Sequence, residues 1–208
     1  GDELFIDEDD GPFSKSNIET AFAINIKNQL ILSLTKFLEI YDSYTIGHSQ
    51  NVANMSSDLA EKIGKKKKKI RDIYWSGLIH DIGKILIPLE ILNKTGPLTD
   101  EEYEVIKIHP VWGYIALQST ELNNIALYIK HHHERWDGGG YPDGLKRNQI
   151  PLESQILAIT DAWDAMTSKR AYRDALPQAA AVEEIRENRG LQFAPEITDV
   201  FLKMVSKK

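Results

Sequence analysis

The 208-residue sequence contains no cysteine. Disulfide bonds, thiolate ligands for metal ions and a cysteine nucleophile are therefore excluded. It also has no uninterrupted apolar run near the ~20 residues that cross a bilayer as a helix, so we expect no membrane insertion. Its opening, GDELFIDEDDGPF, lacks the basic and apolar segments of a signal peptide. These absences favour a cytoplasmic protein. Because the first residue is Gly and not Met, we also expect a sensor or receiver domain outside this sequence.

Positive charge is scarce: the formal net charge is -6 and the isoelectric point is near 5.6. The chain as a whole does not attract polyanions, so we expect no DNA or RNA polymer as a partner, and an anionic ligand needs a local positive site. Five consecutive lysines, Lys65–Lys69, are the one basic run. No aromatic residues interrupt it, so a solvated loop is favoured over a nucleic-acid contact.

No segment alternates with the period of two that strands require, whereas apolar residues recur every three to four positions along much of the chain. We therefore predict an all-α helical bundle. Residues 1–17 form an acidic, flexible leader, and residues 18–208 form one helical domain. The predicted helices cover 18–41, 48–64, 68–85, a segment opened by the capping box at Thr99–Glu102, 121–133, 151–167 and one or two more near the end.

Ionisable residues occupy positions on these helices where the next core residue belongs. The apolar stripe through Ile73 and Gly77 leads to His80, and its neighbour through Leu78 leads to Asp81. Four further side chains extend other stripes inward, and Asp161 stands between Leu157 and Ala165 at four-residue intervals. The whole inward set is His48, His80, Asp81, His109, His132, His133 and Asp161. His131, by contrast, falls off its stripe and is predicted to face solvent.

A single histidine on an apolar face is usually a core residue bonded to a carbonyl, and a single aspartate is more often a cap or an ion-pair partner. Five histidines and two aspartates are harder to bury that way, because each unpartnered polar group costs ~1–3 kcal/mol. A shared cation satisfies imidazoles and carboxylates together. Seven ligands exceed the four of a structural zinc site, so we predict two divalent ions. Such a pair activates water and holds the attacking and leaving oxygens of a displacement at phosphorus.

Three other features suit a phosphate ligand. Lys84 lies one turn beyond His80, where its ammonium can reach a bound phosphate. The glycine-rich stretch Gly138–Pro142 allows close approach of a ligand, although it is also an ordinary surface turn, and it carries Tyr141. Arg170 and Arg173 suit bidentate phosphate contacts, and a solvated helix end explains them equally well.

The motifs resemble a known family. His80–Lys84 reads HDIGK, which is similar to the signature of HD phosphohydrolases, and His132–Leu145, HHERWDGGGYPDGL, resembles the HD-GYP subgroup. The supporting matches are YTIGHS at Tyr44–Ser49, IPLEILNKTGPLT at Ile87–Thr99, the pair His109-Pro110 and DAWDAMTSKRAYR at Asp161–Arg173. The resemblance covers about residues 30–205, nearly the whole chain.

The resemblance implies a helical bundle of the HD phosphohydrolase type with a bi- or trinuclear centre, most often of Fe or Mn. It also implies hydrolysis of the bacterial messenger cyclic di-GMP to linear pGpG or onward to GMP. The implied metal ligands fall on the same seven positions as the inward set. Lys84, Tyr141, Arg170 and Arg173 match positions that contact substrate.

This chain departs from the family pattern at three points. Tyr44 stands where some members carry a glutamate that supplies a third metal, so we predict two ions. Ala194 interrupts a common Phe-Asp-Pro, and Gln155 replaces a frequent arginine.

Two other functions stay open: hydrolysis of a different nucleotide, such as cyclic GMP-AMP or a deoxynucleoside triphosphate, and non-catalytic binding of cyclic di-GMP. The long first helix suits a homodimer contact or a link to a sensor, and packing on its own bundle explains it equally well.

Overall fold

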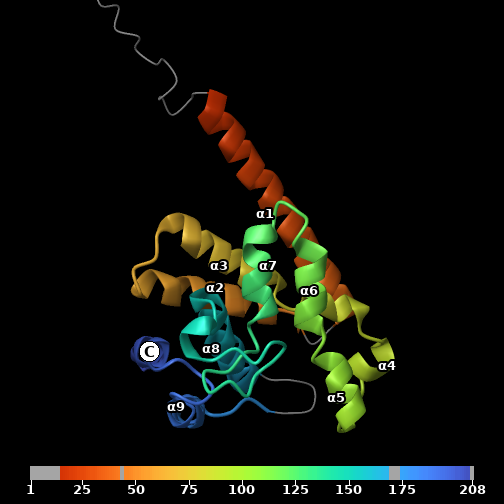
Figure 1. The fold of residues 1–208 in the computed structure, drawn as a ribbon, viewed down its shortest axis with the longest axis vertical. Helices are drawn as coiled ribbons and strands as arrows, with labels where there is room; N and C mark the ends of the chain where they lie inside the picture. The colour runs from red at the N-terminus through yellow and green to blue at the C-terminus, as the bar shows by residue number, and fades with distance from the viewer. Residues whose placement is uncertain (1–14, 43–44, 169–173, 207–208) are drawn as a thin grey trace, which may run out of the picture.

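The computed structural model describes residues 15–42, 45–168 and 174–206, and this part of the chain is built from helices (Figure 1). Its only β-type pairing is an isolated bridge between Arg189 and Phe193. The predicted all-α class is therefore confirmed. The helices are α1 (Lys15–Tyr41), α2 (His48–Lys62), α3 (Lys67–Ile79), η2 (Ile82–Leu86), α4 (Leu89–Leu92), α5 (Asp100–Ile106), α6 (His109–Leu117), α7 (Asn123–Lys130), η3 (Arg147–Gln149), α8 (Leu152–Thr167), α9 (Gln178–Glu187) and α10 (Pro195–Val205).

Two clusters of buried apolar side chains hold the helices together. One joins α2, α3 and α8 to the C-terminal helices α9 and α10, around Phe201 and Ile156. The other joins α1, α2, α3, α6 and α7, around Ile31 and Ile125. Helices α2 and α3 take part in both, and they lie closely side by side because Gly77 has no side chain. A Cβ at Gly77 would come within 2.6 Å of Ala53 Cα.

Several predicted boundaries are wrong in an informative way. The helix predicted for 68–85 ends at Ile79, and a separate 3-10 turn carries Lys84. The helix predicted for 121–133 ends at Lys130, so the three histidines follow it in a turn. The capping box at Thr99 is confirmed, because its hydroxyl accepts from the Glu102 amide while the Glu102 carboxylate accepts from the Thr99 amide. That helix stops at Ile106, and His109 begins a new one.

Helix α1 begins at Lys15, so residues 15–17 belong to the helix and not to the predicted leader. Its C-terminal half packs on the bundle through Ile31, Thr35 and Leu38, while its N-terminal half extends beyond the other helices (Figure 1). Across the described residues, no helix combines the length and the apolar character that a bilayer crossing requires.

Candidate metal centre

The seven predicted ligands are brought together mainly by helix ends. His48 is the first residue of α2, His80 caps the C-terminus of α3, and His109 is the first residue of α6. Asp81 precedes η2, and His132 and His133 follow α7, whereas Asp161 alone lies within a helix, α8. Because side chains at a helix end are not covered by a further turn, residues from several helices can meet at one point.

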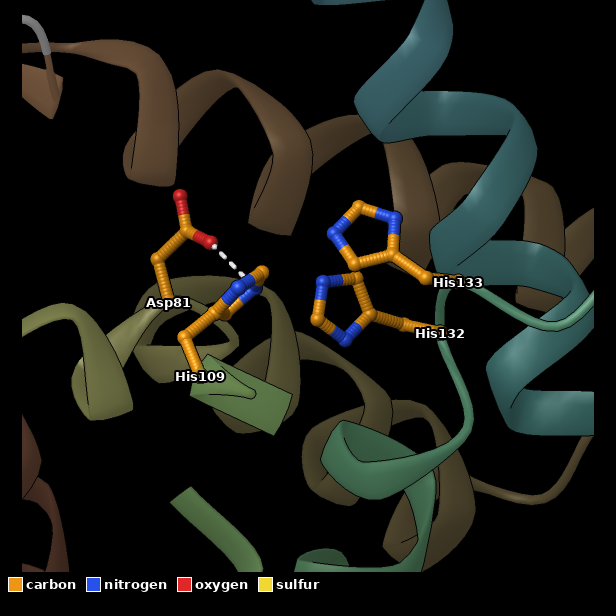
Figure 2. Close-up of side chains that lie close together, drawn as sticks. All are labelled: Asp81, His109, His132 and His133. Atoms are coloured by element: carbon orange, nitrogen blue, oxygen red, sulfur yellow. Dashed lines mark ion pairs between the residues drawn. The ribbon is translucent and has the colours of Figure 1, made fainter. Parts of the chain in front are cut away.

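The imidazole rings form a continuous chain through the site. Ring centroids are 5.2 Å apart for His48 and His80, 5.2 Å for His80 and His132, and 5.4 Å for His109 and His132. His133 lies 3.9 Å from the ring of His132 and 5.1 Å from that of His109. Figure 2 shows Asp81 and His109 facing the paired rings of His132 and His133.

Asp81 lies between two groups of histidines. Its Oδ1 is 3.2 Å from His109 Nε2, and its Oδ2 is 3.4 Å from His80 Nε2. Three sets of potential ligand atoms each fit within 4.8 Å: Asp81, His109, His132 and His133; His48, His80 and Asp81; and His80, His132 and Asp161. Asp81 belongs to two of these sets, so its carboxylate is common to both.

Three of the histidine nitrogens that face the centre have no hydrogen-bond partner. The Nδ1 atoms of His80, His109 and His132 lie 2.9, 2.8 and 2.6 Å from main-chain carbonyl oxygens. In a neutral imidazole, an Nδ1–H that donates to a carbonyl leaves Nε2 unprotonated, with its lone pair directed into the site. These three Nε2 atoms are buried and have no hydrogen-bond partner. A buried acceptor left this way is costly, so the donor set fits a bound cation.

The protonation states also suit metal binding. Burial, followed by the charge of neighbouring imidazoles, holds the pKa of His132 well below its usual range, and similarly lowers that of His133 to about 3. Burial alone would raise the pKa of Asp81, but Lys84 and the histidines outweigh it and keep that pKa well below its ordinary value. His132 and His133 are therefore neutral and Asp81 is ionised, the forms that bind metals.

His48 differs from the other histidines. Its Nε2 is 3.2 Å from Asp161 Oδ1, and its Nδ1 is 2.7 Å from Asp164 Oδ2. Burial would lower the pKa of His48, but these two carboxylates together raise it to about 9. Without metal, a proton therefore stays on this ring at neutral pH, and a cation at the centre has to replace it.

The prediction that His131 faces solvent is wrong, because its ring is buried. Its Nε2 lies 3.0 Å from Asp143 Oδ2, so His131 points into the glycine-rich loop and away from the centre. The same loop is held by Glu134, whose buried carboxylate accepts from the amides of Asp143 and Leu145 at 2.7 and 3.0 Å. The loop is therefore anchored to the turn that carries the ligands.

A cavity of about 440 Å³ opens beside the centre, lined by His133, Asp161 and the glycine-rich loop. Tyr141 stacks on His133 with ring centroids 4.9 Å apart. The predicted Lys84 lies at the centre, with its Nζ 2.6 Å from Asp81 Oδ2. Arg170 and Arg173, and also Tyr44, fall outside the described residues.

Two contributions were not predicted from the sequence. Asp164 supports His48, and its spacing of three residues from Asp161 on one helix was the available signal. Lys107 and Tyr103 of α5 line the cavity, with Lys107 Nζ 5.4 Å from the centre of the Tyr141 ring. Nothing in the local sequence marks those two residues, because α6 and α7 lie between α5 and Tyr141 along the chain.

Comparison with known proteins gives a consistent result. The sequence profile described as HD domain matches residues 33–197. The chain is 38% identical over 178 residues to the cyclic di-GMP phosphodiesterase of Thermotoga maritima, covering 84% of this chain and 48% of that protein. It is 33% identical over 178 residues to the 3'3'-cGAMP-specific phosphodiesterase 2 of Vibrio cholerae, covering 84% of this chain and 34% of that protein. The chain thus spans half or less of the length of these relatives.

Among solved structures, the HD domain of the L. monocytogenes phosphodiesterase PgpH in complex with cyclic-di-AMP superposes with a TM-score of 0.60. The match covers 83% of this chain and 93% of that one at 21% sequence identity. This likeness shows that the two chains share a fold.

Proposed function

This chain belongs to the HD domain family, and we propose that it is a metal-dependent phosphodiesterase that hydrolyses cyclic di-GMP to linear pGpG, GMP or both. The observation that carries the proposal is the meeting of seven imidazole and carboxylate side chains, Asp81 among them, in overlapping ligand sets, with three buried Nε2 atoms that have no hydrogen-bond partner. The names of the relatives support the substrate class.

We further propose two divalent ions, Fe or Mn. Ligand sets that share Asp81 support two positions, and a mixture of imidazole and carboxylate suits these metals. Metal ions held there supply water activation near neutral pH and stabilise negative charge on phosphate oxygens.

The chain's own residues bind and orient the substrate. The Lys84 side chain is 22% exposed, so its ammonium can reach a phosphate while it remains paired with Asp81. Burial, together with nearby Tyr103 and the carboxylates, raises the pKa of Tyr141, which keeps its phenol protonated as a hydrogen-bond donor at the cavity wall. Arg170 and Arg173 remain predicted phosphate contacts.

The test pairs metal analysis of anaerobically purified protein with product chromatography on cyclic di-GMP, cyclic GMP-AMP and a deoxynucleoside triphosphate. We expect about two metals per chain and cleavage of cyclic di-GMP to pGpG or GMP. Preference for cyclic GMP-AMP or for the triphosphate would replace the proposed substrate. A metal-filled protein that binds cyclic di-GMP without cleaving it would favour the non-catalytic alternative.

We propose in addition that α1 mediates a homodimer. The face of α1 opposite its packed side is apolar and at least 45% exposed at Ile18, Phe22, Ile26, Leu30, Phe37 and Ile40. At roughly 100 Å² of exposed surface for each side chain, the stripe offers about 600 Å² per subunit, close to the ~800 Å² of a stable interface. Between Phe22 and Ile40, Lys36 is the one charged residue at the margin of this face. Its side chain is 75% exposed and pairs with Glu39 at 2.6 Å, so a second copy can cover the apolar side chains while Lys36 stays at the edge of the contact.

Sedimentation equilibrium tests this contact. Phe22→Glu combined with Phe37→Glu is expected to convert a dimer to a monomer, while Asn25→Glu, on an exposed side of the same helix, is expected to leave the dimer intact. A wild-type chain that is monomeric at every concentration would show that something else, such as the predicted sensor or receiver domain, covers α1. The cytoplasmic location likewise stays a prediction.

A further inference from the structure

The histidines of the centre are held from behind in two different ways. His80, His109 and His132 each direct Nδ1 at the carbonyl oxygen of the residue three positions earlier, Gly77, Ile106 and Ile129. These acceptors are uncharged. His48 alone directs Nδ1 at a carboxylate, Asp164, at 2.7 Å. An ionised acceptor makes a stronger hydrogen bond and makes the imidazole a better electron donor to a metal.

Asp164 is itself fixed in place. It is only 3% exposed. Its Oδ2 faces His48, and its Oδ1 accepts from Asn51 Nδ2 and from Ser168 Oγ, both at 2.9 Å. Asn51 lies one turn after His48 on α2, and Ser168 caps the end of α8. The carboxylate therefore connects the start of α2 to the end of α8 and holds the His48 ring in one orientation.

The two halves of the centre also differ in charge. Near His48 lie Asp161, 3.2 Å from its Nε2, and Asp164 behind it, in addition to the shared Asp81. The other half combines Asp81 with three imidazoles, those of His109, His132 and His133. A divalent cation is attracted more strongly where more carboxylates surround it, because the buried site screens their charge only weakly.

We propose that the two metal positions bind unequally, and that Asp164 is the positioning residue that makes the position at His48 and His80 the tighter one. The inference rests on the proposed two-metal centre. It predicts stepwise loading, with the first ion at His48 and the second at His109, His132 and His133.

The test is calorimetric titration of the metal-free protein with Mn²⁺, supported by metal counts after graded chelation. Wild-type protein is expected to show two steps of unequal affinity. Asp164→Asn keeps the shape and an acceptor oxygen but removes the charge, and should weaken the tighter step by about 10- to 100-fold while leaving the weaker step unchanged. Ser168→Ala, which removes one support of Asp164, should give a smaller loss in the same step.

Two controls make the outcome specific. Asp199→Asn removes an exposed carboxylate paired with Arg189 and should leave both steps unchanged. His109→Ala should remove the weaker step and spare the tighter one. Circular dichroism of each metal-free variant verifies that it folds.

Two equal steps in the wild-type protein, or an unchanged tighter step in a folded Asp164→Asn variant, would overturn the inference while leaving the two-metal proposal intact. Failure of the wild-type protein to bind Mn²⁺ at all would overturn both. If Asp164→Asn does not fold, Ser168→Ala decides, and an unchanged tighter step in that variant would equally overturn the inference.

Discussion

Replacing Gly83 by alanine tests whether the backbone of the HDIGK motif positions His109. Gly83 lies buried in η2, against the start of α6. A Cβ at this position would come within 1.9 Å of the His109 carbonyl oxygen and 2.7 Å of the Gly113 amide nitrogen. Both atoms belong to the main chain, so no side-chain rotation relieves the contact. Helix α6 would have to move by about 1.5 Å to restore an ordinary separation.

The expected cost follows from that geometry. Overpacking a core typically costs about 1–3 kcal/mol, and a contact with two main-chain atoms belongs at the upper end or beyond. We therefore expect Gly83→Ala to lower the free energy of unfolding by about 3 kcal/mol or more. Because α6 begins with His109, its displacement also lengthens the 3.2 Å contact between His109 Nε2 and Asp81 Oδ1, so bound metal should fall as well.

Urea denaturation in the presence of a chelator measures the stability change without a contribution from metal, and elemental analysis of a second sample measures the metal loss. Gly96→Ala is the matched control, because a Cβ there meets no atom within 4 Å, and its stability should change by less than about 0.5 kcal/mol. Equal stabilities and metal contents for the two variants would show that α6 adapts freely and that Gly83 does not position His109.

Three further predictions concern the ligands. Asp81→Ala should abolish hydrolysis and lower metal content, because it removes the carboxylate common to two ligand sets. His131→Ala should keep the metal content but lose about 1–3 kcal/mol of unfolding free energy, since its buried ring pairs with Asp143. A metal loss in His131→Ala equal to that of Asp81→Ala would contradict the placement of His131 outside the metal centre. Metal-free protein should be most stable near pH 6.5. Below this pH its stability falls, because His133 has a pKa of about 3 in the native state and binds a proton more readily once the chain unfolds. Between pH 6.5 and 9 its stability also falls, because the native state loses the advantage of holding a proton on His48, whose pKa is about 9. Denaturation curves at pH 5, 6.5 and 9 check both slopes, and a flat profile would contradict them. Chelation should lower the midpoint of thermal unfolding, because an ion bound only to the native state stabilises it, and an unchanged midpoint on calorimetry would argue against a resident metal.

Much of the fold could be predicted because helical periodicity is a local property. Apolar spacing identified most of the helices, and the capping box at Thr99 identified the start of α5 to the residue. Helix ends were harder to predict. The stripes through Ile73 and Ile129 continue into polar residues, and nothing nearby in the sequence marks Ile79 or Lys130 as the last helical residue.

The metal centre likewise combines features that local spacing predicts with features that depend on tertiary contacts. Extending apolar stripes selected seven residues that the structure gathers into overlapping ligand sets. His131 was predicted wrongly, because a turn follows α7 and the imidazole pairs with Asp143. Asp164, whose partner His48 lies 116 residues away along the chain, was not predicted.

From the sequence alone one could determine that the chain is helical and that imidazoles and carboxylates replace apolar residues on its buried faces, because both follow from spacing within single helices. Only the tertiary structure decided which carboxylate lies behind which histidine, that Asp81 lies between two groups, and that one face of α1 remains uncovered. Those features depend on how helices distant in sequence end and meet, and no local pattern encodes that.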